Sequence, residues 1–180
     1  MTNTTALVVA HTDQLDAAVL AAADDLLMDV FAADLTHHDW KHSLGGLHAL
    51  VWDGADLIGH ASLVPRRLLH AGRVLRTGYV GGVGVRSDSR RRGHGAAMMA
   101  ALEEMARGTY ELCALAATDQ STAFYSRRGW ILWRGPTSAL TPTAVVRTPE
   151  EDGCIYVLPL KAELDLHGEL TCDWREGEAW

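Results

Sequence analysis

The stretch that decides the fold runs from residue 83 to residue 99 and reads VGVRSDSRRRGHGAAMM. It contains an apolar strand, a turn rich in arginine, and the pattern Arg-x-x-Gly-x-Gly at the start of an apolar helix. Such a turn points several backbone N–H groups at one place, at the positive end of the helix dipole. Gly93 and Gly95 let the backbone approach an anion, and Arg90, Arg91 and Arg92 add positive charge. The stretch therefore predicts a site for a phosphate or pyrophosphate group.

The pattern differs from the common nucleotide-binding loops, because it has neither Gly-Lys-Ser/Thr nor the three glycines of a dinucleotide fingerprint. Its spacing, Val-x-Val-x(4)-Arg-x-x-Gly-x-Gly, resembles the pyrophosphate loop of the GNAT N-acetyltransferase superfamily. The resemblance implies that acyl-CoA is bound by Val83, Val85, Arg90, Arg91, Arg92, Gly93, His94, Gly95 and Ala96. The alternative is a basic loop that only caps an ordinary helix.

Composition indicates one compact domain over residues 1–180, since 48% of the 180 residues are hydrophobic. No apolar run approaches the length of a membrane span, and the first residues do not read as a secretory signal. Three cysteines without a Cys-x-x-Cys pair imply neither a disulfide framework nor a zinc site. We therefore expect a cytoplasmic protein with reduced thiols and no membrane partner.

The net charge of −7 is unevenly distributed. Residues 66–92 hold eight arginines and one acid, whereas residues 148–180 hold nine acids and two basic residues. A basic middle suits an anionic cofactor, and an acidic end suits a cationic substrate, although acidic runs often serve only solubility. The negative total argues against nucleic acid as a partner.

The hydrophobic pattern predicts a mixed α/β domain. We expect helices from Thr12 or Asp13 to Ala33, and over 37–43, 94–107 and 121–128. We expect strands over 5–10, 47–52, 57–64, 74–85, 110–116, 130–133 and 154–160, with a polar loop before the last. The glycines within the 74–85 strand indicate a bulge or a close approach by another backbone or a ligand.

A second signal is the segment Ala-Phe-Tyr-Ser-Arg-Arg-Gly-Trp over residues 123–130. Its pattern Tyr-x-x-x-Gly-aromatic resembles the helix after the fifth strand of GNAT enzymes, where a tyrosine protonates the departing thiolate. The chemistry is reasonable, because a phenol of pKa near 10 can donate to a developing thiolate. Tyr125 is therefore the candidate catalytic acid, and a core tyrosine is the alternative.

The resemblance narrows to one family through HALVW (48–52), RRL (66–68), GYV (78–80), RRGW (127–130), GPTS (135–138), RTP (147–149) and CDWREGEAW (172–180). These segments are similar to the aminoglycoside 2′-N-acetyltransferases over nearly the whole chain. The family implies the GNAT acyltransferase fold: a central mixed, mostly antiparallel sheet flanked by helices, with a splay between strands 4 and 5. It also implies a homodimer.

The family further implies the reaction. Acetyl-CoA donates its acetyl group to the 2′-amine of an aminoglycoside, which attacks the thioester directly and leaves coenzyme A. A backbone N–H near Val83 would polarise the thioester carbonyl, so Val83 is counted with Tyr125 among the catalytic residues. Proximity supplies much of the rate.

The resemblance also implies that acids hold the ammonium groups of the antibiotic: Asp34, Asp39, Glu151, Asp152 and Glu178, with Trp180 closing the site by its ring or terminal carboxylate. Each has an alternative. Asp34 and Asp39 could cap a short helix. The acids near position 151 could be simply solvated, and Trp180 could be a core or interface aromatic.

One departure from the family changes the substrate prediction. The family carries a glutamate after the Tyr-Val of the central strand, where it helps to deprotonate the amine, and this chain has Gly81 followed by Gly82. A small polar position near the substrate is Ala116 here, and Glu151 and Glu178 differ in length from their counterparts. Fewer carboxylates suit a smaller aminoglycoside of the kasugamycin type beside the 2-deoxystreptamine antibiotics.

Other interpretations remain open. The chain could acetylate another small-molecule amine or a protein amine, or bind acyl-CoA or an antibiotic without catalysis. The retained loop and Tyr125 speak against the last. His37, His38 and His42 could bind a metal, but no further ligand motif accompanies them, so we predict no metal site.

Overall fold

The computed structural model describes residues 5–180, so the first four residues of the predicted domain lie outside the described part. The chain forms two compact units. Unit 1 contains the residues up to Val64 and Val80–Met105, and unit 2 contains Pro65–Tyr79 and Ala106–Trp180. The chain passes from one unit to the other inside regular elements, within β3 (Asp56–His70), β4 (Arg73–Val85) and α3 (His94–Thr109).

Unit 1 is built on antiparallel strands. β1 (Thr5–His11) pairs with β2 (Leu47–Asp53) over its whole length, and β2 pairs with the first part of β3. The helices of this unit are α1 (Ala17–Phe31), the short α2 (His37–Trp40) and most of α3. Asp16 caps α1, because its carboxylate accepts a hydrogen bond of 2.9 Å from the Val19 N–H.

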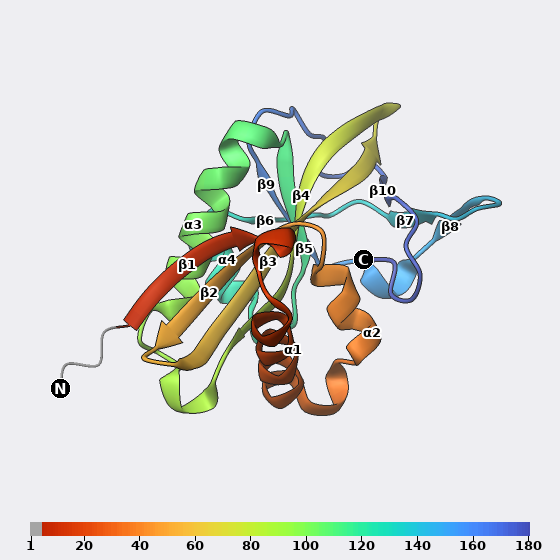
Figure 1. Ribbon diagram of the computed structural model, residues 1–180. Helices are drawn as coiled ribbons and strands as arrows, with labels where there is room; N and C mark the ends of the chain where they lie inside the picture. The colour runs from red at the N-terminus through yellow and green to blue at the C-terminus, as the bar shows by residue number, and fades with distance from the viewer. Residues whose placement is uncertain (1–4) are drawn as a thin grey trace. The chain divides into compact units, whose positions relative to one another are not determined.

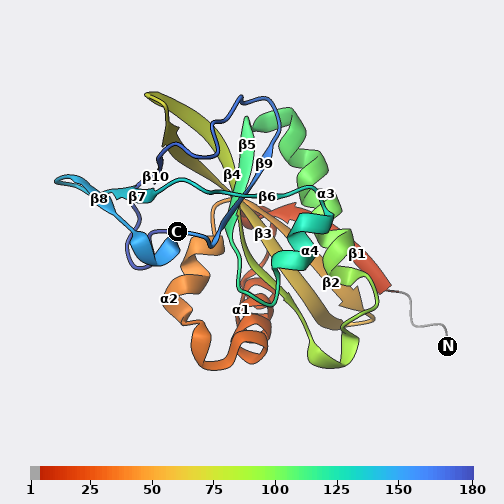
Figure 2. The ribbon, with the colours of Figure 1, turned by 180° about the vertical axis from the view of Figure 1, so that it is seen from behind.

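The two long helices of unit 1 cover opposite faces of its strands (Figures 1 and 2). Leu26 and Leu27 of α1 belong to a buried cluster with Leu50 of β2. The next residue, Val51, points to the other face, where Met98 of α3 lies against Gly59. The alternation of side chains along β2 therefore supplies one core to α1 and a second core to α3.

The glycines of β4 allow α1 to pack closely. A Cβ atom at Gly84 would lie 3.0 Å from a Leu27 methyl carbon and 3.3 Å from one of Val30. Gly82 has a φ of +54°, and a Cβ atom there would lie 2.9 Å from the Ser43 hydroxyl oxygen. The close approach at these two glycines is therefore made by side chains of this unit, and not by the backbone that the sequence suggested.

Unit 2 contains the second part of β3, the first part of β4 and all later elements: β5 (Leu112–Ala116), α4 (Thr122–Arg127), β6 (Ile131–Leu132), β7 (Thr137–Leu140), β8 (Val145–Arg147), β9 (Ile155–Pro159) and β10 (Leu170–Cys172). β5 lies beside β9, and β9 beside β6, in antiparallel pairs (Figure 2). β4 pairs with β5 in parallel over Thr77–Tyr79 and Leu112–Ala114 only. The sheet is therefore mixed, as predicted.

Several predicted boundaries were wrong. The first helix begins at Ala17 rather than near Thr12, because residues 12–14 form a 3-10 turn and Asp16 is the cap. The predicted strand 57–64 continues through Pro65 to His70, and the predicted strand 130–133 is only Ile131–Leu132. The predicted polar loop contains β7 and β8, and β10 follows β9. These missed strands have three or four residues each, too few for a period to show.

Candidate active site

In unit 1, the predicted anion loop joins β4 to α3 as a strand, a loop and a helix. The loop opens with a 3-10 turn over Ser87–Ser89, in which the Ser89 N–H donates to the Arg86 carbonyl. The first bond of α3 runs from the Ala97 N–H to the Gly93 carbonyl, 2.9 Å. Because the first N–H groups of a helix have no partner in that helix, those near Gly93 are available to an anion.

The backbone of this loop takes two left-handed residues, Arg91 with φ +61° and Gly93 with φ +85°. An arginine rarely adopts this conformation, so the loop stores some strain at Arg91. Nothing lies within 4 Å of the place where a Cβ atom of Gly93 would be. The loop therefore has open space beside its backbone, which fits a bulky phosphate group.

The three arginines of the loop are exposed but not equivalent. The Arg90 Nε donates to the Val85 carbonyl, 3.0 Å away, and so ties the start of the loop to the end of β4. Arg86 is paired with Asp88 at 2.8 Å, which keeps the acid of this loop neutralised. Arg91 and Arg92 are thus the clearer candidates for direct contact with a phosphate, and Arg90 also shapes the loop.

The central strand places Gly81, Gly82 and Val83 next to one another in unit 1. The Gly81 carbonyl accepts from the Ser62 hydroxyl at 3.0 Å, and the Gly82 carbonyl from His60 Nδ1 at 2.7 Å. A Cβ atom at Gly81 would make only an ordinary contact, 3.6 Å from the Ser62 Oγ. The site of the missing carboxylate therefore has room for the first carbon of a side chain.

The two acids of the first unit differ in their surroundings. Asp34 is exposed at the end of a 3-10 turn. Thr36 is the N-cap of α2, and Asp39 completes a capping box with it, since the Asp39 carboxylate accepts from the Thr36 N–H at 2.9 Å and the Thr36 hydroxyl at 2.7 Å. Burial alone would raise the pKa of Asp39, but the Thr36 hydrogen bonds and the nearby His42 and His38 lower it. Asp39 thus has a structural role at the start of α2, and its role toward a substrate stays a prediction.

The three histidines near α2 contact different groups. His37 pairs with Asp24 at 2.8 Å, whereas the His38 and His42 rings stack edge to face 5.7 Å apart. Over residues 5–180 no group of three His, Cys, Asp or Glu side chains is arranged to hold a metal ion.

In unit 2, Tyr125 lies on α4 and its ring packs between the rings of Phe124 and Trp130. Burial raises the pKa of Tyr125 to about 12, although Arg128 opposes the shift. The phenol is therefore protonated at neutral pH. The phenol has a proton to give, and the raised pKa makes it a weaker acid than an exposed tyrosine.

The acidic end of the chain brings Glu151 and Glu178 together in unit 2. Burial raises the pKa of the Glu151 carboxyl, and the negative charges of Glu178 and Glu150 raise it further, while Arg175 lowers it. Mutual repulsion of this kind favours a bound cation, because an ammonium group would relieve it. Ala116 ends β5 and is exposed, one residue before the Ala117 N–H that donates to the Cys154 carbonyl.

Asp152 is held by unit 2 itself. Its carboxylate accepts from the Thr137 N–H and hydroxyl, both at 2.9 Å, and pairs with Arg147 at 2.7 Å. The Arg147 and Thr137 hydrogen bonds lower the pKa of Asp152 to about 2. A structural role is thus visible for Asp152, and its role toward a substrate stays a prediction.

Trp180 is also anchored within unit 2. Its ring is buried, with 5% of the residue exposed, and its Nε1 donates to the Thr148 hydroxyl at 3.0 Å. Its main-chain oxygen accepts from Arg175, whose Nε donates to the Glu178 carbonyl. Arg175 thus fixes both ends of the segment that carries Glu178.

Sequence reasoning missed a cationic cluster around Tyr79. The guanidinium carbons of Arg66 and Arg175 lie 4.9 and 5.3 Å from the centre of the Tyr79 ring. Arg66 is buried and paired with Asp173 at 2.7 Å. About a hundred residues separate these partners in sequence, so no local pattern could have joined them.

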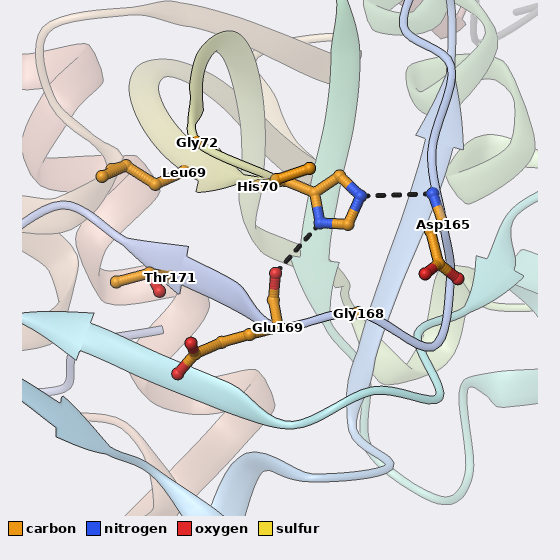
Figure 3. Close-up of a pocket in the computed structure, with 8 residues that line it drawn as sticks. Leu69, His70, Gly72, Asp165, Gly168, Glu169 and Thr171 are labelled. Atoms are coloured by element: carbon orange, nitrogen blue, oxygen red, sulfur yellow. Dashed lines mark hydrogen bonds between the residues drawn. The ribbon is translucent and has the colours of Figure 1, made fainter.

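A pocket of about 370 Å³ opens at the turn between β3 and β4 in unit 2. Figure 3 shows His70 in it, with Nδ1 donating to the Glu169 carbonyl at 3.0 Å and Nε2 accepting from the Asp165 N–H at 3.2 Å. None of the predicted site residues lines this pocket. It is therefore separate from the predicted chemistry.

Comparison with known proteins agrees with these features. Residues 13–132 match the family model of the acetyltransferase (GNAT) domain. The aminoglycoside 2′-N-acetyltransferase of Mycolicibacterium fortuitum is 45% identical over 174 residues, which are 94% of this chain and 89% of that protein.

Solved structures are similar at lower identity. The Escherichia coli GNAT family N-acetyltransferase YhbS, in complex with CoA, superposes with a TM-score of 0.65 at 18% identity, covering 93% of this chain and 89% of that one. Eis1 of Mycobacterium abscessus gives a TM-score of 0.62 at 18% identity. The match covers 75% of this chain and 33% of the Eis1 chain. These matches confirm the predicted fold class.

Proposed function

Because the chain belongs to the aminoglycoside 2′-N-acetyltransferase family of the GNAT superfamily, we propose that it transfers an acetyl group from acetyl-CoA to the 2′-amine of an aminoglycoside. The observation that carries the proposal is the loop between β4 and α3. It offers unpaired helix N–H groups, exposed arginines and open space at Gly93, which together fit a pyrophosphate.

Each predicted residue has a place in this reaction. When bound, acetyl-CoA supplies the thioester whose acetyl group is transferred. The Val83 N–H would polarise the thioester carbonyl, and the protonated Tyr125 phenol would give its proton to the sulfur as the C–S bond breaks. The amine forms the new C–N bond and loses one proton, which water carries to a carboxylate.

Glu151 is well suited to take part in that proton path. It is half-buried, and its raised pKa makes it a better proton acceptor than an exposed glutamate. With Glu178 it also forms the acidic region of unit 2 that would hold ammonium groups, and we assign the same role to Asp34 and Asp39 in unit 1.

We further propose an acceptor with few ammonium groups, of the kasugamycin type, beside the 2-deoxystreptamine antibiotics. Gly81 removes one carboxylate from the central strand, while the space for a side chain remains. A smaller positive charge on the substrate would then need fewer acids. The biological consequence is antibiotic resistance, in the cytoplasm, where acetyl-CoA and reduced thiols occur.

Thiol release from acetyl-CoA by the purified chain tests the function. The panel contains kasugamycin, gentamicin, tobramycin, an aminoglycoside with a 2′-hydroxyl in place of the amine, and a simple polyamine. We expect turnover only with compounds that carry the 2′-amine. Turnover with the polyamine alone would indicate a different amine acceptor, and acetyl-CoA binding without turnover on any compound would indicate a binding protein.

A further inference from the structure

A chain of hydrogen bonds crosses the core of unit 1 and ends at the backbone of the central strand. The Thr12 hydroxyl contacts His48 Nε2 at 2.7 Å, His48 Nδ1 contacts His60 Nε2 at 2.9 Å, and His60 Nδ1 contacts the Gly82 carbonyl at 2.7 Å. Both imidazoles are fully buried, and the Trp40 ring lies against them, 6.0 and 5.4 Å away between centroids.

The direction of these bonds follows from the last acceptor. A carbonyl oxygen can only accept, so His60 carries its proton on Nδ1 and accepts on Nε2. His48 must then donate from Nδ1 and accept the Thr12 proton on Nε2. Burial lowers the pKa of His48 to about 4 and that of His60 to about 3, so both rings are neutral at pH 7. Each ring therefore has one donor and one acceptor, and both are used.

The hydrogen bond from His60 reaches a part of β4 whose backbone is also held by other contacts. Gly82 is left-handed, and Leu27, Ser43 and His60 surround the place where its Cβ atom would be. The preceding carbonyl, that of Gly81, is held by Ser62. Two side chains of β3 thus grip two successive carbonyls of β4, at the position where the family carries a catalytic glutamate.

This grip also fixes the next N–H group. In a trans peptide the C=O and the N–H point in opposite directions, and the described chain contains no cis bond. With the Gly82 carbonyl held on the imidazole, the Val83 N–H points away from it. A hydrogen bond to the carbonyl also polarises the amide, which makes the N–H a better donor.

We propose that His60, backed by His48 and Thr12, is a positioning residue that aims and polarises the Val83 N–H for the thioester carbonyl. The inference rests on the proposed function, since it presumes that an acyl thioester is the donor. Without its imidazole donor, the Gly82–Val83 peptide is less firmly held, and the N–H loses part of its orientation and polarisation.

The test compares four proteins: the parent, His60→Leu, His60→Asn and the control His70→Leu. Leucine removes the donor, whereas asparagine keeps an N–H near the position of Nδ1. His70 is a buried histidine that likewise grips one carbonyl, and it lies outside the proposed machinery. Thermal unfolding first establishes that each variant is folded.

We expect His60→Leu to lower kcat about tenfold to a hundredfold, with KM values within threefold of the parent. This fall is no larger than the one expected when a single oxyanion-hole donor is removed altogether. His60→Asn should recover most of the loss, and His70→Leu should keep the parent kcat. Equal kcat in parent and folded His60→Leu, or equal losses in the Leu and Asn variants, would overturn the proposal.

Two measurements keep the inference testable apart from turnover. The imidazole ¹⁵N shifts of the parent should show Nδ1–H on both His48 and His60, and an Nε2–H tautomer of His60 would refute it without any variant. The carbonyl stretch of bound ¹³C-labelled acetyl-CoA should lie lower in the parent and in His60→Asn than in His60→Leu. If the parent acetylates aminoglycosides but the carbonyl stretch does not differ between the variants, the role of His60 is refuted and the proposed function stands. If the stretch differs but no aminoglycoside is turned over, the proposed acceptor is refuted and the role of His60 stands.

Discussion

At the scale of single residues, Tyr125 is buried at the position where the family resemblance predicts the catalytic acid. Its ring is packed by two aromatic neighbours, and its pKa is raised to about 12. Burial keeps the phenol protonated but makes it a weaker acid, so its role as proton donor stays a prediction.

Tyr125→Phe should lower kcat by roughly a hundredfold, because the leaving thiolate then has no positioned proton donor. The dissociation constant of acetyl-CoA should change little. Tyr156→Phe, which changes another buried tyrosine of unit 2, serves as the control. A kcat of Tyr125→Phe within threefold of the parent would remove Tyr125 from the mechanism.

Gly81 stands where the family resemblance leads us to expect a glutamate, and Gly81→Glu tests what that difference does. The strand has room for the Cβ atom, so we expect a folded variant. If a spacious, weakly acidic site selects a small acceptor, the variant loses turnover of kasugamycin and gains it on antibiotics with more ammonium groups. An unchanged ratio of kcat/KM values across the panel would contradict the proposed preference.

At the scale of elements, β3 and β4 matter most, because they carry His60 and Gly82. Gly82→Ala should cost about 1–3 kcal/mol of unfolding free energy, since its φ is +54° and the new methyl would meet Ser43 and Leu27. Gly81→Ala, one residue earlier, should cost less than about 1 kcal/mol. Urea unfolding of both variants checks this, and equal costs would mean that the left-handed bend is not rigid.

The paired histidines of β2 and β3 should make stability depend on pH. Their pKa values in the folded protein, about 4 for His48 and about 3 for His60, lie below the value of 6.5 in an unfolded chain. The unfolded chain therefore binds more protons below pH 6.5, and stability falls as the pH drops from there toward 4 and 3.

Urea unfolding at pH 6.5 and pH 5 measures the effect. The parent should lose roughly 2 to 4 kcal/mol more than a His48→Asn/His60→Asn variant, in which neither position titrates. Carboxylates contribute equally to both proteins, so the difference isolates the histidines. An equal loss of unfolding free energy in the two proteins would show that the fold does not keep the two histidines neutral.

Sequence patterns predicted elements better than contacts. The strands β1, β2 and β4 and the helix α3 carry strong periodic and turn signals, and they were found within two residues of their true bounds. Two sets of contacts join distant segments and could not be predicted without the fold. They are the hydrogen bonds among Asp152, Thr137 and Thr148, and the stacking of Arg66 and Arg175 on Tyr79. His48 and His60 lie twelve residues apart on adjacent strands, and no sequence pattern predicted that their rings meet.

At the scale of the whole molecule, the family predicts a homodimer, which the single described chain does not test. Sedimentation equilibrium at micromolar concentration should give twice the mass of 19.5 kDa. Persistence of the single-chain mass up to 100 μM would contradict the prediction, and the mass should not depend on whether acetyl-CoA is present.

The route of the chain through its two units has a consequence for engineering. The crossings lie inside β3, β4 and α3 rather than in linkers, so neither unit corresponds to one continuous stretch of sequence. A truncation can therefore not isolate either unit, and a chimera between relatives must exchange several segments at once. A fragment that ends at Met105 contains all of unit 1 but also Pro65–Tyr79 of unit 2, and a fragment that begins at Pro65 contains all of unit 2 but also Val80–Met105 of unit 1.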